Sequence, residues 1–392
     1  MKNRGIQAAF YVVAAAAIAA CSGGANLPQY APAAAPLARP LKPSATQYLY
    51  VYNEGSPGVY SGQYARYSLP DLSLLETTVA DGVGGPVAFG KGDAPYFVDE
   101  AAQGGYALYL QPGGKGAVPG REVFYGIPCQ GSSLATGPTG NVYVVQYCSG
   151  NVLEYSSSKK TGKPKKPIAT YTGGNLGQSG VFPISAVVDL KGDLYVGDNH
   201  GGVTYFKAAS TTGVVALASG SAGYVNQMVA DAKGDVWTVH GSPPEVYFKD
   251  KTSCVPDPSG SIVRYEQGER FSKGTLAQHL YTSTSDSPVL GTNGISIAVD
   301  SARRVYTGNM NTSDDGVLVD FDPGSSCPND ALSFTLPTRA FPQVAVDAQR
   351  RFYVTDYNDN TISAYTGGSK KRLKKITQGT GIVAITYAAV NP

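Results

Sequence analysis

The sequence predicts an all-β chain folded as a seven-bladed β-propeller, with six blades as the alternative. Apolar residues alternate with polar ones from residue 46 onward, and no amphipathic helix interrupts the pattern. The 48 Gly and 26 Pro residues suit a chain with many tight turns. A short motif also recurs seven times. Because 42% of the residues are hydrophobic and 10% aromatic, the chain can bury a large core, which argues against disorder.

The recurring motif is an apolar residue, an aromatic residue and a β-forming residue. The aromatic residues of the seven copies are Tyr50, Tyr96, Tyr143, Tyr195, Trp237, Tyr306 and Tyr353. Four-stranded propeller blades recur about every 40 to 50 residues. Successive copies have this spacing, apart from a longer interval between Trp237 and Tyr306.

A turn residue, Gly or Asp, also recurs at a fixed place in the repeat. In six of the seven copies it stands six positions before the aromatic residue. These residues are Gly90, Gly137, Asp189, Asp231, Asp300 and Asp347. A short strand of small apolar residues precedes each of them, as expected for the innermost strand of a blade. The first copy lacks such a strand, but residues 382–388 have its pattern. We therefore expect 382–388 to pair with 47–52 and close the ring, which removes free edges.

The N-terminus has the features of an export signal, which we assign to residues 1–20. Lys2 and Arg4 precede an apolar stretch that is too short to span a bilayer. Residues 18–21, Ile-Ala-Ala-Cys, resemble a bacterial lipobox, which implies cleavage before Cys21 and a lipid on its thiol. The alternative is an ordinary secretory signal with an incidental cysteine. Residues 21–45 form an Ala/Pro-rich tether and 46–392 the propeller.

These features predict an exported lipoprotein anchored to a membrane, at the outer membrane or the cell surface, with a periplasm-facing position as an alternative. The chain has 31 basic and 29 acidic residues, and Lys2 and Arg4 lie in the segment expected to be removed. The mature chain is therefore neutral, which argues against nucleic-acid binding.

The five cysteines fit an oxidising compartment. With Cys21 lipidated, four remain, and we expect the pairs Cys129–Cys148 and Cys254–Cys327. A zinc site is the competing interpretation. It is weakly supported, because the sequence has no C-x-x-C pair and only three His.

A polar residue stands three positions after each aromatic residue of the motif. The seven are Asn53, Asp99, Gln146, Asp198, His240, Asn309 and Asp356. We expect this polar ring near the mouth of the axial channel, where it would bind a metal or a small polar molecule. The alternative is local, since Asn and Asp side chains cap turns. His240 and Gln146 fit that alternative least well.

The repeat resembles the NHL/YVTN-type β-propellers, and the resemblance covers residues 46–392. That superfamily includes gluconolactonase-like proteins, which implies a divalent cation, calcium or magnesium, at the channel. Candidate oxygen ligands are Asp99, Glu100, Asp198, Asn309 and Asp356, although the chain lacks that family's recognisable ligand motifs. The superfamily also includes streptogramin-lyase-like proteins, which implies His200 and His240 as acid–base groups. Two loop histidines without a catalytic role are the alternative.

Two basic runs, residues 159–166 and 370–375, are expected between the outer strands of their blades. They would contact anionic lipid head groups or polysaccharide, or simply keep an exposed edge solvated. The function predicted from the sequence is a monomeric, membrane-anchored binding or scaffold module with an envelope protein or carbohydrate as partner. The alternative is a metal-dependent lactonase-like or lyase-like enzyme with its site at the channel mouth.

Overall fold

A computed structural model shows how the 392-residue chain folds. It describes residues 47–53, 62–80, 87–89, 95–100, 106–110, 116–117, 121–127, 131–156, 166–219, 224–241, 265–282, 293–310, 316–321, 334–336, 342–356, 359–377 and 385–390. These residues belong to one compact unit, Ala31–Pro392. None of them is helical, so this part of the chain holds no helix able to cross a membrane. The predicted signal, Cys21 and the tether lie outside the described residues.

Four of the sheets are antiparallel and have four strands each. Their strands are β4 (Ala88–Phe89), β5 (Pro95–Glu100), β6 (Tyr106–Leu110) and β8 (Arg121–Ile127); β17 (Tyr224–Ala230), β18 (Val236–Gly241), β19 (Tyr265–Ser272) and β20 (Thr275–Thr282); β21 (Asn293–Val299), β22 (Val305–Met310), β23 (Gly316–Phe321) and β24 (Phe334–Thr335); and β25 (Gln343–Val346), β26 (Phe352–Asp356), β27 (Thr361–Tyr365) and β28 (Arg372–Thr377).

A larger sheet joins eight strands in the order β13-β14-β15-β16-β12-β11-β10-β9. They are β9 (Gly131–Thr136), β10 (Val142–Gln146), β11 (Asn151–Tyr155), β12 (Ala169–Gly173), β13 (Pro183–Val188), β14 (Leu194–Asp198), β15 (Val203–Phe206) and β16 (Thr212–Leu217). Each half, β9–β12 and β13–β16, is an antiparallel meander like the four-stranded sheets. A short parallel pairing of Thr172–Gly173 with Thr212–Gly213 joins the outer strands of the two halves.

The C-terminal strand pairs with the first strand, as the sequence predicts. The sheet has the order β29-β1-β2-β3-β7, with β1 (Tyr48–Asn53), β2 (Gly62–Ser68), β3 (Leu74–Ala80), β7 (Gly116–Ala117) and β29 (Ile385–Val390). Leu49 lies opposite Val390 in an antiparallel ladder. The strand covers 385–390 rather than the predicted 382–388, and 382–384 lie outside the described residues.

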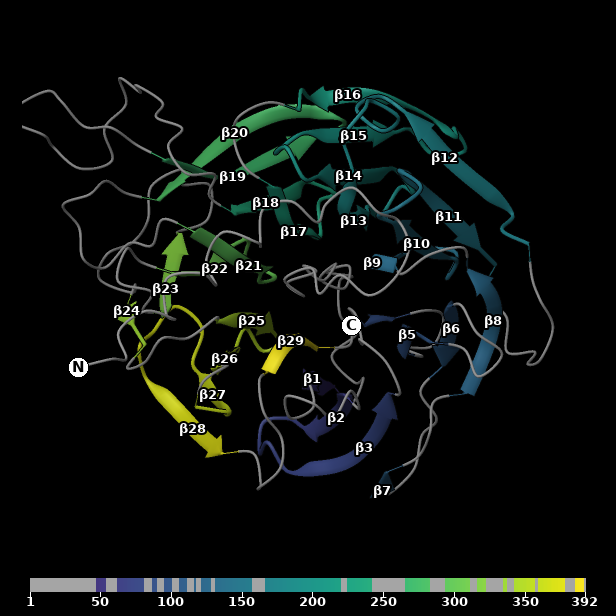
Figure 1. The fold of residues 1–392 in the computed structure, drawn as a ribbon. Coiled ribbons are helices and arrows are strands. Elements are labelled where there is room, and N and C mark those ends of the chain that lie inside the picture. Colours follow the sequence, from purple (N-terminus) through teal and green to yellow (C-terminus); the bar gives the residue numbers. More distant parts are fainter. Residues whose placement is uncertain are drawn as a thin grey trace, which may run out of the picture. The chain divides into compact units, whose positions relative to one another are not determined.

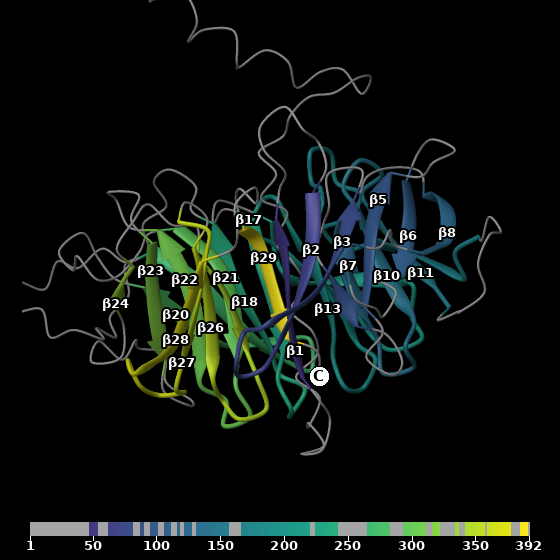
Figure 2. The same cartoon turned by 90° about the horizontal axis from the view of Figure 1, so that it is seen from below.

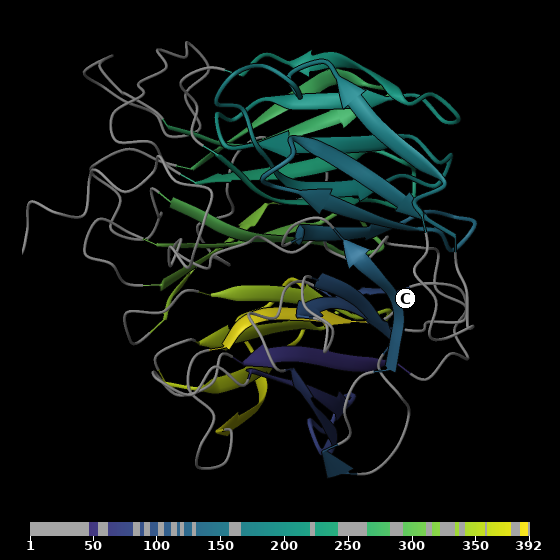
Figure 3. The ribbon, with the colours of Figure 1, turned by 45° about the vertical axis from the view of Figure 1, so that its right-hand side comes forward.

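The sheets are arranged around a common centre (Figure 1). The first strands of successive meanders, β4, β9, β13, β17, β21, β25 and finally β29, contact one another in that order. Neighbouring sheets pack face to face (Figure 3), and the strands run from one face of the molecule to the other (Figure 2). Tyr50, Phe89 and Ala389 share a buried cluster, so the β29-β1 sheet also packs against the β4–β8 sheet.

The core lies between the sheets, and the motif aromatics are part of it. Tyr195, Tyr306 and Tyr353 have no exposed surface, and Trp237 is 1% exposed. Hydrogen bonds of the turn Asp explain why it stands at a constant distance before the motif aromatic residue. Asp231 Oδ1, for example, accepts hydrogen bonds from the backbone N–H groups of Lys233 and Asp235. Asp189, Asp300 and Asp347 make the same pair of bonds, so each carboxylate closes the turn between its first and second strands.

The second basic run does not lie only in a hairpin, which corrects the sequence-based expectation. Lys370 and Lys371 precede β28, but residues 372–375 form the first part of that strand, the outermost of its sheet. All six side chains are exposed. Lysines on an edge strand discourage pairing with another chain. Of the first run, only Lys166 is described, and it is exposed.

Candidate functional site

The polar ring lies where the second strands of the sheets end. Asn53, Gln146, Asp198 and Asp356 are the last residues of β1, β10, β14 and β26, and Asp99, His240 and Asn309 stand one residue before the ends of β5, β18 and β22. The side chains of Asn53, Asp99 and Glu100 lie outside the described part of the structure. The five described members are buried, with exposed fractions of at most 5%. They therefore do not project freely into solvent.

A β-bulge recurs opposite the polar ring. At each bulge, the ring residue and the residue before it pair with two residues on the neighbouring first strand, and one unpaired residue lies between those two. This extra residue occurs in β9, β13, β17, β21 and β29. His240, for example, lies opposite Val225, whereas Val239 lies opposite Gln227. Bulges of this kind bend a strand and redirect its side chains, and they are common beside functional sites.

Polar residues that follow the bulge join neighbouring sheets. Ser185 Oγ donates a hydrogen bond to the Val225 carbonyl (2.8 Å), and Ser296 Oγ donates one to the Pro342 carbonyl (2.7 Å). Gln227 Oε1 accepts a bond of 2.6 Å from the Ile297 N–H. Sequence reasoning missed these positions, although small polar residues at a fixed place in the first strand were a usable signal.

Asp198 has the structural role that the sequence left as one of two alternatives. Its Oδ1 accepts hydrogen bonds from the backbone N–H groups of His200 (2.8 Å) and Gly202 (2.9 Å). Its Oδ2 accepts one from Ser219 Oγ at 2.6 Å. Asp356 Oδ1 similarly accepts a bond from the Asp359 N–H. Both carboxylates therefore stabilise the turns that follow their strands.

His240 and Asn309 each contact a threonine two residues earlier on the same strand. His240 Nε2 lies 3.0 Å from Thr238 Oγ1. Asn309 Nδ2 donates hydrogen bonds to Thr307 Oγ1 (2.8 Å) and to the Thr307 carbonyl (3.2 Å). The two pairs occupy equivalent positions in the neighbouring β17–β20 and β21–β24 sheets, and all four side chains are buried.

Asn309 holds a buried side-chain oxygen with unused hydrogen-bonding capacity. Its Oδ1 is buried and accepts no hydrogen bond from any residue that the structure describes. Leaving a buried acceptor unsatisfied costs about 1–3 kcal/mol, and native proteins hold few such groups. Asn309 therefore offers an acceptor with unused capacity at the strand end.

The direction of the Asn309 side chain follows from the alternation of side chains along β22. Gly308 faces the β25–β28 sheet, because a Cβ on Gly308 would lie 2.3 Å from the Pro342 carbonyl oxygen. Asn309 and Thr307 consequently face the β17–β20 sheet. The unused acceptor therefore lies near the end of β22 and faces the β17–β20 sheet.

The two candidate acid–base histidines lie in different environments. His200 is exposed, and its Nε2 lies 3.1 Å from the Gly180 carbonyl oxygen. His240 is 2% exposed, so it is not the solvent-facing loop residue that the non-catalytic alternative assumed. Within the described ranges, no group of three or more His, Cys, Asp or Glu side chains is placed to hold a metal ion.

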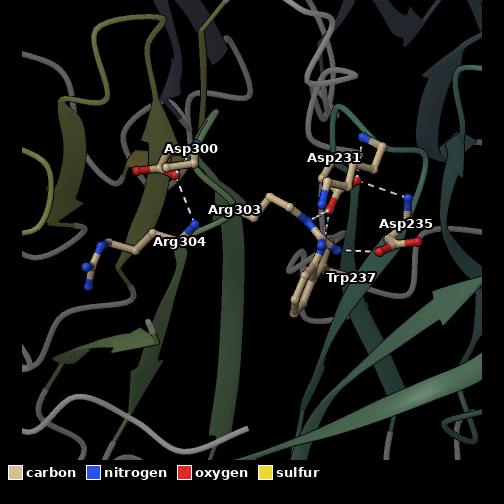
Figure 4. A network of polar contacts seen from close by, with 8 residues as sticks. Asp231, Asp235, Trp237, Asp300, Arg303 and Arg304 are labelled. Carbon is tan, nitrogen blue, oxygen red and sulfur yellow. Dashed lines mark hydrogen bonds and ion pairs between the residues drawn. The ribbon is translucent and has the colours of Figure 1, made fainter. Parts of the chain in front are cut away.

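The opposite ends of the same strands carry a second polar network, centred on the Asp turns (Figure 4). Asp231 Oδ2 accepts hydrogen bonds from Trp237 Nε1 (3.1 Å) and from Arg303 Nε (2.6 Å). Arg303 comes from the corresponding turn of the next sheet and also pairs with Asp235. In the same way, Arg350 Nε bonds Asp300 Oδ2 at 2.8 Å. An arginine from one turn thus neutralises the aspartate of the preceding turn.

Cys148 is disulfide-bonded. Its partner lies outside the described residues, as do Cys129, Cys254 and Cys327, so both predicted pairings stay predictions.

Comparisons with known proteins show the fold. No family model and no curated protein matches the chain. A candidate 6-phosphogluconolactonase from Bacteroides fragilis NCTC 9343 is similar, with a TM-score of 0.61, 10% identity, and coverage of 89% of this chain and 99% of the other. One from Bacteroides uniformis ATCC 8492 has a TM-score of 0.58 and 11% identity over 88% and 100% of the chains. The Dos1 propeller has a TM-score of 0.56 and 10% identity over 87% and 88%. At these identities the likeness concerns the fold alone, and the chain has the fold of a β-propeller.

Proposed function

We propose that the chain is an exported, lipid-anchored β-propeller with seven blades that binds a polar ligand on the face where the second strands end. The blade count rests on treating β9–β12 and β13–β16 as separate blades. Each of them is a complete antiparallel meander, and only a two-residue parallel pairing joins them. The pairing of β29 with β1 supplies the inner strand that blade one otherwise lacks.

Asn309 carries the proposal for binding. Its buried Oδ1 has no partner among the described residues, and its side chain faces the neighbouring β17–β20 sheet. An amide oxygen at such a place suits a ligand that donates hydrogen bonds, such as the hydroxyl groups of a carbohydrate or the amide of an envelope protein. The recurrent bulge beside the ring supports the same interpretation.

The N-terminal features support the anchor. The lipobox-like residues 18–21 and the Ala/Pro-rich tether suit a folded body held at a membrane surface. The register of β9 and β10 also supports the Cys129–Cys148 disulfide. Gly131 lies opposite Gln146, so each cysteine stands two residues beyond a paired position. Metabolic labelling with palmitate tests the anchor, since Cys21→Ala should abolish both labelling and membrane fractionation.

The alternative is a lactonase-like or lyase-like enzyme that uses a divalent cation, with His200 and His240 as candidate acid–base groups. Two candidate 6-phosphogluconolactonases share the fold over most of this chain, which favours lactones among the substrates to try.

One experiment separates the two functions. Residues 31–392 are melted with a panel of oligosaccharides, sugar phosphates and sugar lactones, and lactone hydrolysis is followed by proton release with and without EDTA. A binding module raises its melting temperature with a panel member and releases no protons. An enzyme consumes a lactone and loses this activity in EDTA.

The matched variants are Asn309→Val, which removes the proposed acceptor, and Ser133→Ala, which removes another buried side-chain oxygen without a described partner. The proposal predicts that Asn309→Val weakens the thermal shift and that Ser133→Ala does not. A panel without effect on the wild type, or an equal shift in Asn309→Val, contradicts it.

A further inference from the structure

Asp189 holds a buried carboxylate oxygen with no partner in the described structure. Its Oδ1 accepts hydrogen bonds from the backbone N–H groups of Lys191 (2.8 Å) and Asp193 (2.9 Å), as in the other Asp turns. Its Oδ2 accepts none from the described residues, and the whole residue is 1% exposed. Burial raises the pKa of this carboxyl group, and the nearby Asp193 adds to the rise. Lys191 acts in the opposite direction, but no basic side chain among the described residues bonds Asp189 Oδ2.

The next two turns show what fills the equivalent position. Asp231 forms an ion pair with Arg303, and Asp300 forms one with Arg350 (Figure 4 shows the first pair). Each arginine stands three residues after the Asp of its own turn and crosses to the preceding sheet. Arg303 contacts Asp231 and Asp235 together. Their equivalents in the β13–β16 half are Asp189 and Asp193, which stand at the same spacing.

Gly234 occupies the position of these arginines in the turn that faces Asp189. A Cβ on Gly234 would lie 3.6 Å from Asp189 Oδ2, and apart from its chain neighbours no other atom of the described residues would lie within 4 Å. The backbone has the same left-handed conformation in all three turns, with φ of +81° at Gly234, 67° at Arg303 and 63° at Arg350. A side chain at position 234 would therefore point toward the Asp189 carboxylate, but glycine has no side chain to reach it.

The equivalent positions are open to the surface. Asp231 and Asp300 have no exposed side-chain area, whereas the side chains of Arg303 and Arg350 are 19% and 42% exposed. A guanidinium group can therefore cover a buried carboxylate of this kind while its stem lies at the surface. Asp189 is 1% exposed, but no described arginine bonds its Oδ2. We call the place beside Gly234, where a side chain would lie against Asp189 Oδ2, the slot.

We propose that this slot binds a guanidinium group supplied from outside the chain. Guanidinium is planar, is less strongly hydrated than an ammonium ion and donates several hydrogen bonds in a fixed geometry, so it suits the unused Oδ2 of Asp189. Asp193 adds negative charge beside it, although its own oxygens already accept bonds from the Tyr205 hydroxyl and the Ala208 N–H. The group belongs to a small guanidinium compound or to an arginine of a partner protein. The slot lies at the opposite strand ends from Asn309, and the inference does not depend on the proposed function.

Thermal melting of residues 31–392 tests the slot with L-argininamide and with millimolar guanidinium chloride. L-lysinamide and NaCl at matched ionic strength are the controls. At a concentration of ten times its Kd, a ligand of the folded state should raise the melting temperature of a unit this long by about 2 °C. The expected result is a rise with the two guanidinium compounds that exceeds the rise with either control.

Two variants locate the effect. Asp189→Asn removes the charge but keeps the Oδ1 acceptor that closes the turn, and it should lose the shift. Gly234→Arg supplies the arginine in cis, so it should melt above the wild type and no longer respond. An acetylated Gly-Arg-Gly amide distinguishes the sources: tighter binding than L-argininamide points to a partner's arginine, and equal binding to a small compound. An equal shift with L-lysinamide, an unchanged shift in Asp189→Asn, or no shift in the wild type overturns the inference.

Discussion

Replacing Arg303 by glycine tests whether the arginine that joins two sheets stabilises the fold. The change removes the 2.6 Å bond from Arg303 Nε to Asp231 Oδ2 and the pair with Asp235. It also relaxes the backbone, because Arg303 has a φ of 67°, which glycine adopts without strain. The two effects have opposite signs, so their sizes decide the outcome.

The lost ion pair is the larger effect. Removing one partner of a buried pair costs about 3–5 kcal/mol. The lower end applies here, because the Arg303 side chain is 19% exposed and Asp231 keeps Trp237 Nε1 and two backbone N–H donors. Because glycine adopts the left-handed conformation without strain, the substitution recovers about 1 kcal/mol of folding free energy. The net loss is about 2 kcal/mol, or about 3 °C for a unit of this length, at an unfolding entropy of about 2.1 cal/mol/K per residue.

Differential scanning calorimetry of residues 31–392 measures this loss. Arg350→Gly is the matched control, since it removes the same interaction with Asp300 and the same strain, with a φ of 63°. The Arg350 side chain is 42% exposed, so solvent screens the Arg350–Asp300 pair better, and we expect a smaller decrease in melting temperature. If Arg303→Gly melted at or above the wild-type temperature, the strain would outweigh the pair and the reasoning would be refuted.

Three further predictions concern packing, pH and ring closure. Gly308→Ala places a Cβ 2.3 Å from the Pro342 carbonyl oxygen and should cost about 1–3 kcal/mol in chemical denaturation, whereas Gly137→Ala, whose nearest contact is 3.3 Å, should cost less. Burial raises the pKa of Tyr171 to about 12, so the stability it gives is intact below the unfolded-state pKa of about 10 and is lost between pH 10 and 12. Deletion of residues 385–392 exposes the edge of β1, and size-exclusion chromatography should show aggregates.

Each of these has an outcome that counts against it. Equal losses in the two alanine variants would show that the sheets can separate slightly at Gly308. The melting temperature of Tyr171→Phe should fall less steeply above pH 10 than that of the wild type, and identical slopes would exclude a role for this hydroxyl. A monomeric deletion variant with native stability would show that β29 is dispensable.

The sequence predicted the parts of the fold that depend on local pattern. The Asp turns could be found because one carboxylate must accept two backbone N–H bonds at a fixed distance along the chain, as Asp231 does. The pairing of β29 with β1 followed from an apolar strand without a local partner. For Asp198 the sequence left two alternatives open, and the hydrogen bonds from the His200 and Gly202 N–H groups are those of the turn-forming one.

Features that depend on contacts between sheets could not be found in this way. The bulge opposite His240 inserts a single residue and leaves no periodic signal in a short strand. Arg303 was unremarkable in the sequence, because its partner is 72 residues away and its left-handed backbone is typical of glycine. The pairing of β12 with β16 joins the edges of two meanders and involves only two residues from each.

Isothermal titration calorimetry with the carbohydrate that gives the largest thermal shift tests the central claim, that Asn309 binds a ligand at the ends of the second strands. The loss of one hydrogen bond to an uncharged acceptor corresponds to about 0.5–1.5 kcal/mol. The account therefore predicts a Kd about 2- to 12-fold weaker for Asn309→Val and unchanged for Ser133→Ala. The same Kd for the wild type and Asn309→Val would contradict it.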